Sequence, residues 1–125
     1  MLLAWISCCA LAAQRPASEP PPEPPEEDVA LAPREYTLNP VQSKKEITAG
    51  NFYFKKGNYR AAATRYREAT RWDNGSAEAF FKLGEANEKA RDLKAAREAY
   101  ETYLKLEGDA KIAAALRKKI AKWPK

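Results

Sequence analysis

Side chains that commonly act in catalysis are scarce in this sequence of 125 residues. Histidine is absent, and both cysteines, Cys8 and Cys9, lie within the first ten residues. After residue 13 the only serines are Ser18, Ser43 and Ser76, and none of them stands with an evident base. The sequence also lacks zinc-ligand spacing and a glycine-rich phosphate loop. We therefore predict a noncatalytic protein that binds no metal and no cofactor.

The acidic residues Glu85 and Glu88 come closest to a paired carboxylate site. They follow Lys82 and precede Lys89 within about one helical turn on either side. This spacing is typical of ion pairs on an exposed helix surface and does not require acid–base chemistry.

The charge of the chain is unevenly distributed. The formal net charge is +5, but residues 1–43 hold two arginines against six acidic residues, whereas residues 44–125 hold twenty basic residues against eleven acidic ones. The basic second part of the chain could therefore attract an anionic partner.

Residues 1–13, MLLAWISCCALAA, form an apolar run that is shorter than the roughly 20 residues of a membrane-spanning helix. The run predicts an export signal peptide. Cleavage at Ala10-Leu11-Ala12 would release a secreted chain, whereas a lipobox-like sequence at Cys8 or Cys9 would give a membrane-tethered lipoprotein. A buried helix of the folded domain is the remaining alternative. Export would place the protein in the periplasm or at the outer membrane of a bacterium.

Residues 14–38 have the composition of a linker. Eight prolines lie between positions 16 and 40, with acidic residues among them, so this stretch lacks backbone donors and apolar surface. We predict a disordered, extended spacer that lifts the domain away from a membrane; a proline-rich ligand for a partner's aromatic groove is the alternative.

Five helices are predicted from residue 39 onward, joined by tight turns. Capping residues mark their starts: Asn39 with Pro40 and Gln42, then Asn58, Ser76, Asp92 and Asp109. Gly57, Asp73-Asn74-Gly75, Gly108 and Pro124 mark stops.

The first pair of these helices recurs in the second pair at a spacing of 34 residues. The matching pairs are Gly50 and Gly84, Tyr59 and Leu93, Ala62 and Ala96, Tyr66 and Tyr100, and Trp72 and Leu106. A helical hairpin repeated at this period resembles the tetratricopeptide repeat. The resemblance implies an all-α solenoid over residues 39–109, with repeats at about 43–76 and 77–110 and a capping helix over 110–125.

The repeated residue types have a packing explanation. We expect the paired glycines and alanines to lie where helices cross closely, and the large paired side chains and Tyr103 to fill the space beside them. The last helix carries a single apolar stripe of Ile112, Leu116, Ile120 and Trp123, with its lysines and arginine facing elsewhere, as a solvating cap would. Glu46 and Asn87 depart from the apolar pattern, so they either weaken the core or mark another contact.

The run GNFYFKKGNYRAAATRYREA, residues 50–69, is similar to the opening repeat of BamD-type outer-membrane assembly lipoproteins. This resemblance implies an envelope protein that takes part in outer-membrane protein assembly.

In tetratricopeptide repeats the first helix of each pair lines the concave face. Repeat phase then places on that face Lys44, Ile47, Asn51, Phe54 and Lys55, together with Phe81, Lys82, Glu85, Glu88 and Lys89. Apolar contacts from Phe54 and Phe81 beside lysines suit an extended or helical peptide that carries acidic groups or a free carboxylate. Ile47 stands where peptide-binding relatives that clamp a terminal carboxylate have lysine.

Two further interactions are predicted from the size and charge of the domain. The basic last helix could bind an anionic membrane or another polyanion, although export argues against nucleic acid. Two repeats are fewer than a stable stack usually needs, so self-association or a larger repeat partner would supply the missing burial.

Overall fold

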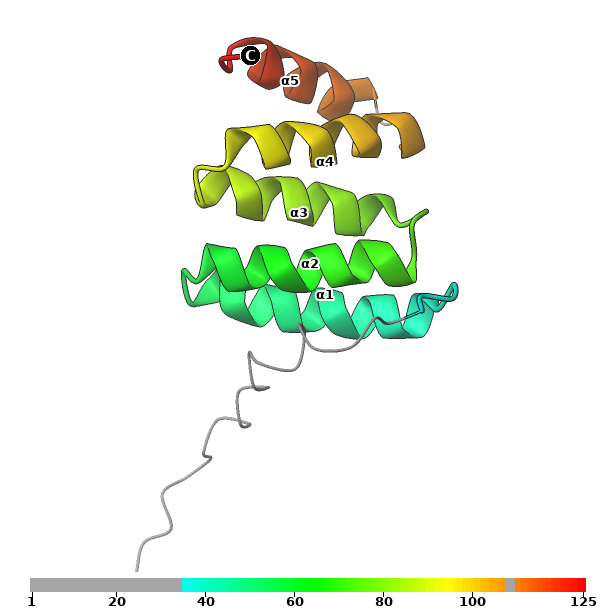
Figure 1. Cartoon of the computed structure of the whole chain (residues 1–125). Helices are drawn as coiled ribbons and strands as arrows, with labels where there is room; N and C mark the ends of the chain where they lie inside the picture. The colour runs from blue at the N-terminus through cyan, green and yellow to red at the C-terminus, as the bar shows by residue number, and fades with distance from the viewer. Residues whose placement is uncertain (1–34, 108–109) are drawn as a thin grey trace, which may run out of the picture. The chain divides into compact units, whose positions relative to one another are not determined.

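The computed structural model describes residues 35–107 and 110–125. These residues form the helices α1 (Pro40–Lys55), α2 (Tyr59–Trp72), α3 (Ala77–Lys89), α4 (Leu93–Leu106) and α5 (Ala110–Ala121) (Figure 1). No strand occurs in these two ranges, so the predicted all-α helical-repeat fold is confirmed. The predicted export signal, the cysteines Cys8 and Cys9, and linker residues 14–34 lie outside the described residues.

The first four helices begin at their predicted caps. The side-chain oxygens of Asn39, Asn58, Ser76 and Asp92 accept hydrogen bonds from the backbone amides three residues later, at 3.0 to 3.3 Å. Such bonds satisfy amides that have no partner within the first turn of a helix. The predicted cap Asp109 of α5 lies outside the described residues.

The side chain of Gln42 does not complete the predicted capping box. Its Nε2 donates to Glu46 Oε1 at 3.1 Å. The backbone amide of Asn39, which Gln42 was expected to reach, donates instead to the Trp72 carbonyl at 2.8 Å. The start of α1 is therefore tied to the end of α2.

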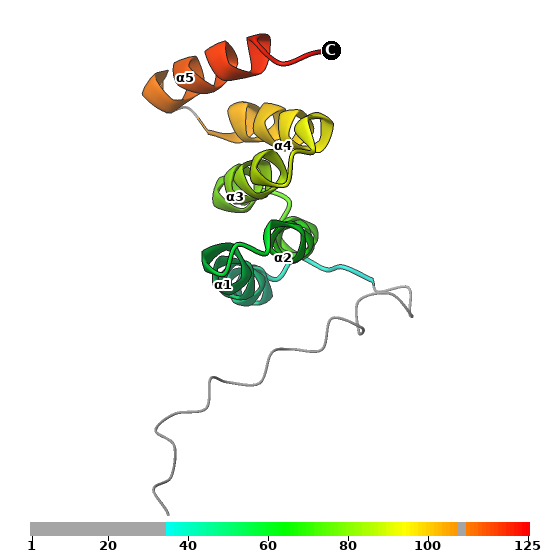
Figure 2. The ribbon, with the colours of Figure 1, turned by 90° about the vertical axis from the view of Figure 1, so that its left-hand side faces the viewer.

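The helices form two antiparallel hairpins, α1–α2 and α3–α4, stacked through α2 and α3 (Figure 1). In the end-on view, α1 and α3 lie on one side of the stack and α2 and α4 on the other (Figure 2). Helix α5 continues beside α4, where Leu116, Ile120 and Trp123 join a cluster built on Tyr100 and Tyr103. The helix therefore covers the open side of the second hairpin.

Both predicted glycines lie at close contacts, but the contact is to a tyrosine ring and not to a facing backbone. A Cβ added to Gly50 would lie within 3.0 Å of three ring atoms of Tyr66, and a Cβ on Gly84 would meet Tyr100 in the same way. Real Cβ atoms do not approach so closely, so both positions require glycine in this packing.

The predicted core positions of the two hairpins are buried or half-buried with one exception. Ala62, Ala96, Tyr66 and Tyr100 are each at most 2% exposed. Leu106, however, is 43% exposed, and this prediction was wrong because no described segment covers the end of α4.

The predicted apolar stripe of α5 is correct for three of its four residues. Leu116 is buried, and Ile120 and Trp123 pack against the second cluster. Ile112 is 39% exposed, whereas its neighbour Ala113 is buried in the first turn. The helix therefore turns a smaller side chain toward the protein at its start.

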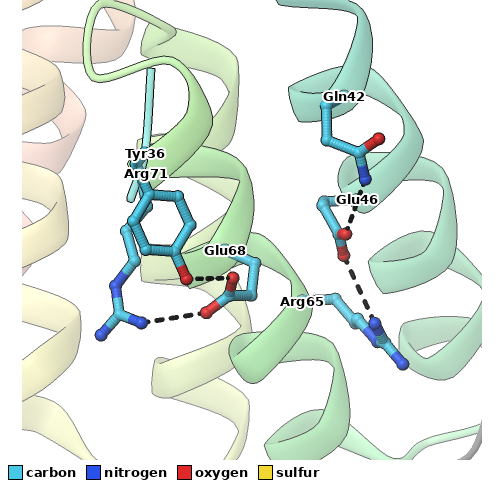
Figure 3. Close-up of polar contacts among 6 residues, drawn as sticks. All are labelled: Tyr36, Gln42, Glu46, Arg65, Glu68 and Arg71. Atoms are coloured by element: carbon cyan, nitrogen blue, oxygen red, sulfur yellow. Dashed lines mark hydrogen bonds and ion pairs between the residues drawn. The ribbon is translucent and has the colours of Figure 1, made fainter. Parts of the chain in front are cut away.

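The two residues that depart from the apolar pattern have different environments. Glu46 is buried, and its carboxylate pairs with Arg65 Nη1 at 3.5 Å while accepting from Gln42 (Figure 3). The carboxylate therefore has partners on both helices of its own hairpin. Asn87 is 4% exposed in a hollow that Phe80 also lines.

Tyr36, which lies in the stretch that the sequence assigns to the linker, contacts α2. The hydroxyl of Tyr36 donates to Glu68 Oε2 at 2.7 Å, and its ring meets Trp72 edge-on with centroids 5.0 Å apart. Arg71 bonds the other oxygen of Glu68 at 3.0 Å (Figure 3). The buried Glu68 carboxylate is thereby satisfied, and the contact holds the chain entering α1 against α2.

Candidate functional site

The predicted binding residues lie on α1 and α3, the two helices on one side of the stack (Figure 2). We define the odd-helix face as Lys44, Asn51, Phe54 and Lys55 of α1 with Glu78, Phe81, Lys82, Glu85, Glu88 and Lys89 of α3. Each of these residues is exposed or half-buried. Ile47 is 5% exposed within the first core cluster, so its predicted place on this surface is wrong.

An ion pair bridges α1 and α3 at one end of the odd-helix face. Lys44 Nζ lies 4.0 Å from Glu78 Oε2, and the two side chains are 79% and 52% exposed. Water and salt screen such a pair, so it contributes little to stability. Both groups remain able to exchange this contact for one with a ligand.

Asn51 is held by a tyrosine from the facing helix of its own hairpin. The hydroxyl of Tyr66 donates to Asn51 Oδ1 at 2.7 Å, and the tyrosine ring beneath is buried. The bond fixes which end of the side-chain amide points to the tyrosine, and the amide nitrogen is a donor by its chemistry. An amide held in this way could pair with the backbone of an extended peptide.

Tyr100 makes the corresponding contact in the second hairpin. The copy of Asn51 is Glu85, but Tyr100 contacts Glu88, one turn further along α3. Its hydroxyl donates to Glu88 Oε2 at 2.8 Å. Lys119 Nζ from α5 lies 3.1 Å from the other oxygen of Glu88. Glu88 therefore forms its ion pair with α5, whereas the sequence indicated Lys82 or Lys89 as its partner. Helix α5 thus takes part in this face.

Both tyrosine hydroxyls remain protonated well above neutral pH. Burial is the main cause that raises the pKa of Tyr66 to about 12, with the charges of Glu85 and Glu78 adding to it. Burial also raises the pKa of Tyr100, followed by its hydrogen bond to Glu88 and the charges of Glu88 and Glu85. Glu85 thus acts on both rings and adds negative charge between the two hairpins.

Sequence reasoning missed the polar role of these tyrosines. Tyr66 and Tyr100 were predicted as core residues, and their rings are buried. Their hydroxyls nevertheless reach side chains of the odd-helix face. A tyrosine at both repeated positions, where phenylalanine would fill the same core, was the available signal.

The two predicted apolar contacts, Phe54 and Phe81, are shared between the core and the surface. Phe54 meets Tyr59 edge-on at 5.1 Å between ring centroids. Phe81 lies 5.8 Å from Tyr100 and 5.1 Å from Tyr103 by the same measure. Both rings remain half-buried, so each is held by aromatic neighbours while part of it is open to a ligand.

Phe81 also lines a shallow hollow at the α5 end of the face. The other lining residues are Glu78, Tyr103, Glu107 and Ile112. The odd-helix face therefore combines an aromatic floor with charges of both signs, and Lys55, Lys82 and Lys89 supply its positive charge.

Within residues 35–107 and 110–125, no group of three histidine, cysteine, aspartate or glutamate side chains could hold a metal ion. None of the helices in these ranges is long and apolar enough to span a membrane.

Two family models match the chain. One described as "TPR repeat" matches residues 50–90, and one described as "Tetratricopeptide repeat" matches residues 77–109. The two matches overlap over residues 77–90, which include α3, and together cover residues 50–109, from the last turns of α1 to the end of α4. A search of curated proteins gives no match.

Proposed function

We propose that this chain, whose residues 50–109 contain tetratricopeptide repeats, is a noncatalytic protein-interaction module that binds an acidic peptide on its odd-helix face. The observation that carries this proposal is the half-buried pair Phe54 and Phe81, held by aromatic neighbours and flanked by lysines. Tetratricopeptide repeats generally bind protein or peptide partners.

The chemistry of the face favours a peptide with apolar and acidic side chains. Partly open aromatic rings offer contact area that is already ordered, so little side-chain entropy is lost on binding. Lys55, Lys82 and Lys89 can pair with carboxylates, including a terminal one. Asn51, oriented by Tyr66, supplies an amide for the peptide backbone.

The proposal extends to the location of the protein. We place it in the bacterial cell envelope, in the periplasm or on the outer membrane, and assign it a part in outer-membrane protein assembly. Its support is the apolar run of residues 1–13, with lipid attachment at Cys8 or Cys9, and the likeness of residues 50–69 to BamD-type lipoproteins. Mass spectrometry of the mature N-terminus tests this part, since a diacylglyceryl cysteine would establish it and an intact Met1 would refute it.

A binding titration tests the odd-helix face. Fluorescence anisotropy would follow a labelled peptide of glutamate and leucine with a free C-terminal carboxylate. Phe81→Ala and Lys82→Glu should each weaken binding by about tenfold or more, because one removes an apolar anchor and the other reverses a charge.

The matched control for this titration lies on α4. Lys94→Glu makes the same charge change as Lys82→Glu at an exposed position outside the odd-helix face. It should leave the affinity within about twofold of wild type, since a screened distant charge has little effect. Equal losses in both lysine variants would mean that net charge, and not this face, governs binding.

Helix α5 favours a second candidate function. Its residues Lys111, Arg117 and Lys118, and Lys122 directly after the helix, are exposed and could hold an anionic membrane surface. Under this alternative, binding to vesicles that contain anionic lipid would fall steeply with salt and would survive Phe81→Ala. Vesicle binding that requires Phe81 would exclude it.

A further inference from the structure

Helix α1 has a second uncovered surface, which meets the odd-helix face at Lys44. The corresponding surface of α3 is closed by the first hairpin, because Ala79, Leu83 and Ala86 are buried in the same cluster as Ala62 and Ala69 of α2. In α1, which begins the stack, no described helix takes the place of α2. One surface of each repeat is therefore built to receive a helix, and in the first repeat it is open.

Two residues of this open surface are larger than their copies, which are fully buried alanines. Thirty-four residues before Ala79 and Ala86 stand Lys45 and Phe52. With Val41 and Thr48 they follow the spacing i, i+4, i+7 and i+11, which is one stripe along a helix. We define this stripe of Val41, Lys45, Thr48 and Phe52, with Leu38 at its start, as the α1 end face.

The α1 end face keeps apolar groups in contact with solvent. Leu38 is 74% exposed and Val41 is 69% exposed, the two most exposed large apolar side chains among the described residues. Val41 lines a groove together with Pro40, Lys44, Lys45 and Thr48. Exposed apolar residues in one groove, rimmed by charge, mark a contact surface more often than scattered ones do.

The charge of this surface indicates which kind of partner it would bind. Lys44 and Lys45 line the groove, and Lys56 lies over the Phe52 ring at 4.5 Å. The stripe itself holds no acidic residue, and the nearby carboxylate of Glu78 already faces Lys44. A partner with acidic side chains beside its apolar contacts would therefore be complementary.

A second copy of the chain stacked end to end would not supply this complement. The other end of the stack is α5, whose exposed charged side chains are basic: Lys111, Arg117, Lys118, Lys119 and Lys122. Such stacking would bring like charges together, which disfavours association.

We infer that the α1 end face docks an acidic amphipathic helix of a partner protein, which takes the place that α2 occupies against α3. The helix would set apolar side chains over Val41 and Leu38 and direct its carboxylates to Lys44 and Lys45. This site shares Lys44 with the proposed peptide-binding face but does not use Phe54 or Phe81.

The test uses two synthetic helical peptides, each long enough to span α1. Both carry leucines at helical spacing, one with glutamates and the other with lysines on the remaining surface. The glutamate peptide should bind the chain, the lysine peptide should not, and a proline in the middle of the glutamate peptide should abolish binding because it breaks the helix.

Substitutions on the chain locate the site. Val41→Asp should weaken binding of the glutamate peptide by about tenfold or more, and Lys45→Glu should weaken it while strengthening the lysine peptide. Ile112→Asp, an equivalent change of an exposed residue at the other end, should have no effect. Because the glutamate peptide can also occupy the odd-helix face, Phe81→Ala should leave unchanged only the part of the binding that Val41→Asp removes, which separates this site from the proposed function.

Three outcomes would overturn the inference. Equal binding of both peptides would remove the charge selection, and loss of binding with Phe81→Ala but not with Val41→Asp would place the helix elsewhere. A dimer seen by light scattering that Val41→Asp dissociates would identify a second copy of the chain as the occupant.

Discussion

Positions 46 and 80 correspond in the two hairpins, yet one holds a buried carboxylate and the other a phenyl ring. Each has a matching partner on the second helix of its hairpin. Glu46 pairs with Arg65 at 3.5 Å, whereas the copy of Arg65 is Ala99, which lines the same hollow as Phe80. The corresponding positions thus hold an ion pair in the first hairpin and apolar side chains in the second.

Other positions differ according to their neighbours. Trp72 is covered by Tyr36, whereas its copy Leu106 is 43% exposed. Lys45 faces solvent at the start of the stack, whereas its copy Ala79 is buried under the first hairpin. The glycine–tyrosine contact inside each hairpin is repeated, whereas the surroundings of Trp72 and Lys45 are not repeated at their copies.

The glycine–tyrosine contact should be the most sensitive of the repeated features. Gly50→Val and Gly84→Val place a branched side chain against Tyr66 and Tyr100. Each should lower the free energy of unfolding by about 3 kcal/mol, as measured by urea denaturation.

Gly75 provides the control for these two variants. A Cβ there would meet only Asp73 Oδ1, at 3.5 Å. Gly75→Val should change the free energy of unfolding by less than about 1 kcal/mol. A large loss in only one of the two hairpins would show that their internal packing is not equivalent.

Changes to the pair Glu46 and Arg65, whose copies are Phe80 and Ala99, should have a smaller effect on the free energy of unfolding. Arg65→Ala leaves the Glu46 carboxylate, whose side chain is 10% exposed, without its cation. The free energy of unfolding should fall by about 2 kcal/mol. The double variant Glu46→Phe, Arg65→Ala imports the apolar pair and should recover to within about 1 kcal/mol of wild type. A double variant no more stable than the single one would contradict the equivalence of the two sites.

Substitutions in the turns that join the helices of each hairpin should change the stability in opposite directions in the two hairpins. Gly57 and its copy Arg91 both have positive φ, at 78° and 64°. Only glycine adopts this conformation without strain, so Arg91→Gly should stabilise the chain by about 1 kcal/mol and Gly57→Arg should destabilise it by a similar amount. Calorimetry should show melting temperatures shifted by about 4–8 °C in opposite senses. Shifts of the same sign in the two variants would contradict the claim that positive φ favours glycine at both turns.

The tyrosine hydroxyls should have no effect on pH dependence near neutrality. The folded-state pKa of Tyr66 is raised to about 12 from its ordinary value of 10.0, and that of Tyr100 is raised as well, so their contribution to stability is complete below pH 10 and is lost as the pH rises toward 12. The loss follows because the unfolded chain releases these protons first.

Comparing wild type with Tyr100→Phe isolates this effect from lysine titration. The stability difference between the two should be constant from pH 7 to 9 and should shift in favour of Tyr100→Phe above pH 10. A difference that stays constant to pH 11 would mean that the hydroxyl is not buried.

Much of the fold follows from local and repeated signals in the sequence. Capping residues such as Asn58 and Asp92 define helix starts because their side chains bond amides only three residues away. The 34-residue spacing identifies Gly50 and Tyr66 because both repeats pack their two helices through the same glycine–tyrosine contact. These signals require no knowledge of distant contacts.

Features that depend on distant contacts were not predictable in the same way. Tyr36 lies 32 residues from Glu68 in the sequence. Nothing in the neighbouring sequence indicates that Tyr36 contacts α2. Repeat phase also placed Ile47 on the binding surface, although its side chain belongs to the core. The pairing of Lys119 with Glu88 depends on how α5 packs, which the periodicity of that helix does not specify.

Residue-resolved NMR offers the most direct test of peptide binding on the odd-helix face. Backbone amide shifts of the chain would be followed while the acidic peptide with a free carboxylate is added. We expect the largest changes at Asn51, Phe54, Phe81 and Lys82 on α1 and α3. Changes confined to α5, or no saturable change at all, would contradict this function.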